Sequence, residues 1–304
     1  MDPNPIHVII LAILQGVTEL FPVSSLGHTV ILPGLLGWSD TLQSPIFVPL
    51  LVMLHLGTSV ALIGEFWHDW VNLLRGGART LIAGKFTRDV DPEGYGRQLA
   101  LVVVGCVPVG IVGVLFQNVV EDNFSKPILV AAFLVANGAV LLLGERLWSR
   151  QRARQKLIAE KAPEFGSIGR SVNDMTFAQA ALIGGAQVFA LIPGFSRSGL
   201  TMVAGMANGL SHEAAARFSF LLATPVILGA GVIEVPKLLE HQYRGELPIA
   251  LIGGVVSGIA AYLSVRFLMR YFQTNRLDPF AFYCVIVGVL AFVYFALKAF
   301  NIVP

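Results

Sequence analysis

The sequence predicts an all-α polytopic membrane protein, with six transmembrane helices and two re-entrant helix hairpins arranged as an inverted repeat. Of the 304 residues, 55% are hydrophobic and 13% are charged, and the mean hydropathy is +0.72. Average soluble proteins carry about 25% charged residues. One soluble core could not bury this much apolar surface, which indicates a membrane protein. The apolar runs are long enough to cross a bilayer. Polar motifs interrupt two of these runs, and these two are the predicted hairpins.

The first interrupted run lies at the amino terminus. Residues 6–20 are expected to form a half-helix, Pro22 to Ser25 a break, and residues 26–36 the returning half. Each half is too short to cross a hydrocarbon layer of about 30 Å, which needs about 20 residues. Broken backbone persists at membrane depth only where it is buried in protein or lines a polar cavity. We therefore expect a hairpin that dips into the membrane.

The remaining apolar runs supply the spans and a second hairpin. Spans are predicted at residues 44–65, 98–117, 127–145, 214–235, 247–268 and 279–300. The second hairpin is predicted at 177–209, with its break at Pro193 and Gly194. Cys106 and Cys284 lie within apolar runs, and such cysteines suggest neither a disulfide framework nor a metal site.

The distribution of Lys and Arg predicts the orientation in the membrane. Most of the 21 basic residues fall in three loops, 66–97, 146–176 and 266–277. Because cytoplasmic loops carry the excess of Lys and Arg, these loops are expected in the cytoplasm. Both termini then face outward, and the first hairpin opens from outside. We expect these basic loops to contact anionic lipid, and we expect no nucleic-acid partner.

A weak internal repeat runs through the chain. One constant shift along the sequence aligns these pairs: Gln15 with Gln187, Ser24 with Ser196, Gly27 with Gly199, and Thr29 with Thr201. The predicted repeats are about 6–145 and 177–300, joined by the basic linker 146–176, within a single membrane domain, 1–304. An odd number of spans separates the hairpins, so the copies are inverted, as in many transporters.

The hairpin breaks carry groups suited to an anion. A charge at bilayer depth costs roughly 2.5 to 3.5 kcal/mol and is by default a functional hypothesis. Helix starts present free N–H groups, serine hydroxyls add donors, and Arg197 adds a planar fork suited to phosphate oxygens. The expected phosphate-binding residues are Ser24, Ser196, Ser198, Gly199 and Thr201.

Glu19 and His28 suggest chemistry beyond binding. A carboxylate can orient an imidazole, so Glu19 is expected to orient His28, which could serve as a base or nucleophile. The phosphoryl acceptor is either His28 or Ser25 activated by it. Glu19 and Gln15 lie on one helix face, and their oxygens could hold Mg²⁺ or Ca²⁺ together with phosphate oxygens.

Plainer interpretations exist for each residue alone. A lone Glu in a membrane helix can be protonated and bonded to a neighbour, and the Ser196 to Ser198 segment could merely cap the next helix. The constellation of Glu, His, Arg and four Ser at two breaks is harder to dismiss. His55 lies in the middle of a span with no second polar feature beside it, and we assign it no role.

The motifs resemble those of the undecaprenyl-pyrophosphate phosphatase family, the bacitracin-resistance membrane proteins of bacteria. The resemblance runs through Q-G-V-T-E-L-F-P-V-S-S-L-G-H (15–28), M-T-F-A-Q-A (175–180), P-G-F-S-R-S-G-L-T (193–201) and F-S-F-L-L-A-T-P (218–225). It implies hydrolysis of undecaprenyl pyrophosphate to the monophosphate and inorganic phosphate, which recycles the cell-wall lipid carrier and confers bacitracin resistance. It also implies a divalent cation, a bacterial plasma-membrane location with the site open to the outer face, and a homodimer.

By position, the resemblance assigns catalytic roles to Glu19, Ser25, His28 and Arg197. Gln15 stands where the family pattern admits Glu or Gln, so a metal site needing two carboxylates is not supported. Two other functions compete with hydrolysis. Inverted repeats and broken helices also suit a transporter that flips a polyprenyl phosphate. A type-2 phosphatidic acid phosphatase is less compatible, because Val203 stands where its motif needs a histidine.

Overall fold

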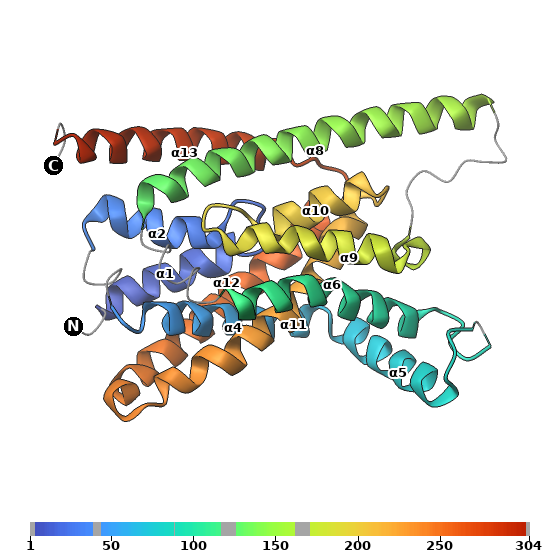
Figure 1. Cartoon of the computed structure of the whole chain (residues 1–304), viewed down its shortest axis with the longest axis horizontal. Helices are drawn as coiled ribbons and strands as arrows, with labels where there is room; N and C mark the ends of the chain where they lie inside the picture. The colour runs from blue at the N-terminus through green and yellow to red at the C-terminus, as the bar shows by residue number, and fades with distance from the viewer. Residues whose placement is uncertain (1–3, 39–43, 88, 117–125, 162–170, 302–304) are drawn as a thin grey trace.

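The computed structural model describes residues 4–38, 44–87, 89–116, 126–161 and 171–301, and these are all-helical, with no strand in the described ranges (Figure 1). Six of the described helices are long and apolar enough to cross a membrane. They are α4 (Phe47–Glu65), α6 (Tyr95–Leu115), α8 (Pro127–Lys161), α11 (His212–Leu238), α12 (Leu247–Tyr271) and α13 (Asp278–Ala299). The six spans predicted from the sequence are confirmed in number and place.

The outward faces of these helices are apolar. On α12, Leu251, Val255 and Ile259 are exposed at a spacing of four residues, which places them on one side of the helix. The opposite side buries small residues, and Gly254 lies close to the backbone of α4. An exposed apolar stripe opposite a tightly packed face is the pattern of a helix that contacts lipid on one side.

The first hairpin consists of α1 (Pro5–Thr18) and α2 (Ser25–Leu36). The Asn4 side chain caps the start of α1, and the chain leaves the helix at Glu19. Ser24 has a φ of 67°, which is unusual for a residue with a side chain, and its hydroxyl accepts a hydrogen bond from Gly27 N. The predicted break and return therefore form as expected.

The second hairpin consists of α9 (Phe177–Ala186), the 3₁₀ turn η3 (Gln187–Leu191) and α10 (Arg197–Ala207). A capping box between Thr176 and Gln179 begins α9. Gly194 in the break has a φ of 110°, and a Cβ there would lie 2.5 Å from the carbonyl oxygen of Val130 on α8. Only glycine fits this turn against α8.

The two hairpins pack in a reciprocal manner. The first half-helix of the amino-terminal hairpin, α1, packs against α12, while α9 of the other hairpin packs against α6. Ser196 caps α10 by accepting from Gly199 N, as Ser24 does for α2. Both cap pairs belong to the aligned residues of the predicted repeat. The duplication, and the depth of the hairpins in the membrane, stay predictions.

Two segments differ from the sequence prediction. The basic loop 66–97 contains a helix, α5 (Trp67–Ala83), so a loop is wrong for most of it. Leu73, Gly76, Gly77 and Thr80 follow the helical period and are buried. The predicted span ending at 145 continues as α8 through the first part of the linker, to Lys161. Residues 162–170 of that linker lie outside the described residues.

The two ends of the bundle differ in charge. Figure 1 places both termini at one end of the long axis and α5, with the carboxyl end of α8, at the other. The second end carries Arg75, Arg79 and Arg150 on these two helices. This arrangement agrees with the orientation expected from the basic loops, which itself stays a prediction.

Candidate active site

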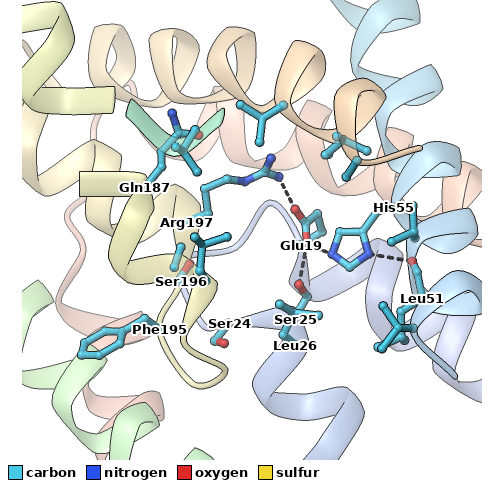
Figure 2. Close-up of a pocket in the computed structure, with 18 residues that line it drawn as sticks. Glu19, Ser24, Ser25, Leu26, Leu51, His55, Gln187, Phe195, Ser196 and Arg197 are labelled. Carbon is cyan, nitrogen blue, oxygen red and sulfur yellow. Dashed lines mark hydrogen bonds and ion pairs between the residues drawn. The ribbon is translucent and has the colours of Figure 1, made fainter. Parts of the chain in front are cut away.

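The breaks of the two hairpins meet at one cavity of about 180 Å³ (Figure 2). Its polar lining residues are Glu19, Ser24, Ser25, His55, Gln187, Ser196 and Arg197. The rest of the wall is apolar and comes from α2, α4, α6, η3, α11 and Phe195 in the second break. Pockets for drug-sized ligands occupy about 300 to 1,000 Å³, so this cavity suits a small polar head group rather than a long chain.

A fully buried side chain on α8 holds the two breaks together. Asn137 Nδ2 donates a hydrogen bond to Pro22 O at 3.1 Å, and Asn137 Oδ1 accepts one from Ser196 N at 2.9 Å. Ser198 Oγ adds a bond to Phe21 O at 3.2 Å. Sequence analysis missed Asn137, whose only signal was an amide inside an apolar span.

The Glu19 carboxylate is the centre of the polar network. Its Oε2 accepts hydrogen bonds from Ser25 Oγ and, at 2.9 Å, from Gln15 Nε2, and lies 3.2 Å from His55 Nε2. Its Oε1 pairs with the guanidinium of Arg197 (Figure 2). A buried charge is tolerated where it is paired and hydrogen-bonded in this way.

Arg197 is the first residue of α10 and reaches across from one hairpin to the other. One terminal nitrogen binds Glu19, and the other donates to Ala223 O on α11 at 3.2 Å. These bonds fix the plane of the guanidinium. Since the group has five N–H donors, others remain for an anion in the cavity. The prediction that Glu19, Ser25 and Arg197 come together is therefore matched by their geometry.

The expected phosphate-binding residues divide into two groups. Ser24 and Ser196 line the cavity, whereas Ser198, Gly199 and Thr201 are absent from its described lining. The hydroxyl of Thr201 donates to Arg197 O at 2.8 Å and Gly199 N donates to the Ser196 hydroxyl at 3.2 Å. These groups stabilise the start of α10, and their expected role in phosphate binding stays a prediction.

His28 lies away from the cavity. Its Nδ1 is 2.7 Å from Ser24 O, and its Nε2 is 2.8 Å from the Tyr283 hydroxyl on α13. The imidazole also stacks on the Tyr283 ring. The expectation that Glu19 orients His28 is therefore wrong in this structure, because both ring nitrogens bond elsewhere.

His55 occupies the place that His28 was expected to take. It lines the cavity from α4 and contacts Glu19, so the assumption that it has no polar neighbour is wrong. The contact joins Glu19 to α4, with helix α2 between them in the chain, and nothing in the local sequence reveals it. The available signal was an ionisable group at membrane depth, which by itself indicates function.

The donor set around Glu19 fits a divalent ion that takes few ligands from the protein. The described residues contain no cluster of three or more His, Cys, Asp and Glu side chains able to hold a metal. Gln15 Oε1 is buried and has no hydrogen-bond partner within the described structure, while Gln15 Nε2 donates to Glu19 Oε2. Mg²⁺ is commonly held by one or two carboxylates plus substrate phosphates. Gln15 and Glu19 could therefore be its protein ligands.

The fold and the site define a class of protein. Six apolar spans surround two broken hairpins, and the breaks present a carboxylate, a guanidinium and hydroxyls to one small cavity. This is a multi-pass membrane protein with a small cavity, partly lined by polar side chains, where its two hairpins meet.

The chain belongs to the family described as bacitracin resistance protein BacA, whose family model matches residues 8–290. It is 48% identical to undecaprenyl-diphosphatase 2 of Burkholderia lata, over 95% of this chain and 96% of the relative. It is 45% identical to undecaprenyl-diphosphatase of Acidiphilium cryptum, over 95% of this chain and 98% of that relative. The resemblance inferred from the hairpin motifs is confirmed.

Proposed function

We propose that this protein is an undecaprenyl-diphosphatase, which hydrolyses undecaprenyl pyrophosphate to undecaprenyl phosphate and inorganic phosphate. The reaction returns the lipid carrier to cell-wall synthesis. It also consumes the pyrophosphate form of the carrier, and this confers resistance to bacitracin. The observation that carries the proposal is the Glu19, Ser25 and Arg197 cluster where the two breaks meet. The names of the relatives identify the substrate.

Ser25 is the proposed nucleophile. Its hydroxyl donates to Glu19 Oε2, so the carboxylate can accept the proton as Oγ attacks the terminal phosphorus. The new Oγ–P bond forms as the bridging P–O bond breaks, and undecaprenyl phosphate leaves. Water then attacks the phosphoserine and releases inorganic phosphate. His28 is a weaker candidate, because its ring nitrogens are occupied outside the cavity.

Arg197 is the proposed phosphate ligand. Its guanidinium lies at the cavity wall beside the amino terminus of α10. Hydrogen-bond donors placed where charge develops are commonly the largest single contribution to catalysis. Ser24 and Ser196 line the same wall and are proposed to bind phosphate oxygens.

A divalent cation, Mg²⁺ or Ca²⁺, is proposed as the cofactor. Gln15 Oε1 and the Glu19 carboxylate would hold it, with phosphate oxygens as further ligands. Bound there, it would neutralise part of the pyrophosphate charge that one arginine leaves unbalanced.

The cavity is proposed to open toward the outer face of the plasma membrane. The spans contribute lining residues from the halves that the basic loops assign to the outside, such as Val48 and Val52 near the start of α4 and Val109 near the end of α6. Apolar side chains on this wall fit the first isoprene units, and the rest of the chain would lie in lipid. A homodimer is proposed from the family resemblance and can be checked by light scattering in detergent.

The test is phosphate release from undecaprenyl pyrophosphate by the purified protein in detergent, with and without EDTA. Release that EDTA stops would support a metal-assisted phosphatase. Detergent abolishes membrane sidedness, so transport cannot produce this signal. Absence of release by folded protein with metal present would refute hydrolysis and favour the transporter.

A further inference from the structure

His55 is an imidazole held from both sides in the wall of the cavity. Its Nδ1 lies 2.7 Å from Leu51 O, one turn earlier on α4. Because a carbonyl only accepts, Nδ1 carries a hydrogen in this bond. The ring is thereby oriented with Nε2 toward Glu19 Oε2, at 3.2 Å (Figure 2), and Nε2 donates to this carboxylate in the imidazolium form, because a neutral ring with its hydrogen on Nδ1 has only a lone pair at Nε2.

Glu19 lies at the carboxyl end of its own helix, which holds it through Gln15: Glu19 N donates to Gln15 O, and Gln15 Nε2 donates to Oε2. The helical stretch α1 ends at Thr18, and Glu19 is the residue at which the hairpin begins to break. Partial rotation of the carboxylate would move one oxygen out of line with Arg197 and the other out of line with Ser25. A contact from α4, which is a separate element, restrains that rotation.

The two oxygens of Glu19 have different partners. Arg197 binds Oε1, whereas Ser25 and His55 both contact Oε2. The oxygen that His55 contacts is therefore the one that receives the Ser25 hydroxyl. Gln15 also donates to Oε2, but it comes from the preceding turn of the same helical segment. His55 is the partner of this oxygen that ties it to a span.

We propose that His55 is a positioning residue, which holds the Glu19 carboxylate in the orientation that accepts the Ser25 hydroxyl. The consequence for turnover rests on the proposed function, whereas the restraint on Glu19 does not. The role requires a hydrogen-bonding nitrogen at the place of Nε2, not an imidazole as such. Glutamine can place an amide nitrogen there, and leucine cannot.

The experiment compares His55→Leu with His55→Gln in purified protein in detergent. For His55→Leu, kcat should fall about tenfold to a hundredfold, because a hydrogen bond to a charged group is lost. KM should change little, since Arg197 still binds phosphate. His55→Gln should restore most of kcat, and Thr58→Val, a buried change one turn further along α4, should match the wild type.

A second measurement does not depend on turnover. Dicyclohexylcarbodiimide is an apolar reagent that modifies carboxyl groups, and mass spectrometry reports its attachment at Glu19. His55→Leu should speed this modification several-fold, whereas His55→Gln and Thr58→Val should not. Equal labelling and equal kcat in His55→Leu and wild type would overturn the proposal, as would a glutamine variant as impaired as the leucine variant. Changed labelling without phosphate release by the wild type would support the restraint and refute only the proposed function.

Discussion

Replacing Asn137 by leucine removes a side chain that hydrogen-bonds both hairpin breaks. The variant keeps a similar volume on α8 but loses the donor to Pro22 O and the acceptor for Ser196 N. Both backbone groups belong to buried residues. The two breaks would lose the bridge through Asn137 and keep the Ser198 Oγ bond to Phe21 O, so the cavity that they form should loosen.

The expected loss of stability can be bounded. Leaving a buried donor or acceptor without its partner costs about 1 to 3 kcal/mol. An average interhelical hydrogen bond in a membrane protein contributes only about 0.6 kcal/mol. With two bonds lost at a site that is 0% exposed, the free energy of unfolding should fall by about 1 to 6 kcal/mol.

Thermal unfolding in detergent, followed together with phosphate release, measures the effect. The melting temperature of Asn137→Leu should drop by several degrees, and turnover should fall more than substrate binding. Ser257→Ala is a suitable control, because the Ser257 hydroxyl is buried without a hydrogen-bond partner in the described structure. An Asn137→Leu protein that melts and turns over like the wild type would refute the assigned link between the breaks.

Three further experiments test the site and the hairpin. Arg197→Ala should reduce phosphate release at least a hundredfold, because donors at the developing charge are lost; near-normal turnover would exclude this residue as the phosphate ligand. Ser25→Ala should abolish release while His28→Gln leaves a measurable rate, and the reverse order would identify His28 as the nucleophile. Gly194→Ala should lower the melting temperature, since its backbone conformation and close packing reject a Cβ. Gly185→Ala should leave the melting temperature unchanged, because there is open space at its Cβ position. Equal melting temperatures of the two variants would contradict the packing argument.

The hairpins and spans could be predicted because their signals are local. Proline, glycine and serine punctuate the apolar runs at both breaks, and hydropathy alone places the six spans. The helix α5 was missed because its charges suggested a loop. Its helical period is visible only in the buried positions Leu73, Gly76 and Thr80.

The pairing of side chains across the cavity could not be predicted in the same way. Nothing near His28 indicates that its ring bonds Tyr283 at the far end of the chain. The bonds from Asn137 to both breaks likewise depend on how α8 lies against the hairpins. Such contacts follow from the packing of whole helices, and the sequence near each residue does not record them.

The pairing of Glu19 with Arg197 has a consequence for biosynthesis. The two residues are 178 positions apart. Ribosomes add about 5 to 20 residues per second, so Arg197 is synthesised roughly ten to thirty-five seconds after Glu19. During that interval the nascent chain already contains α4, which brings His55 into reach. Ser25 on α2 and His55 on α4 both precede Arg197 in the chain, so these two partners from other helices are available to the carboxylate before the arginine is added.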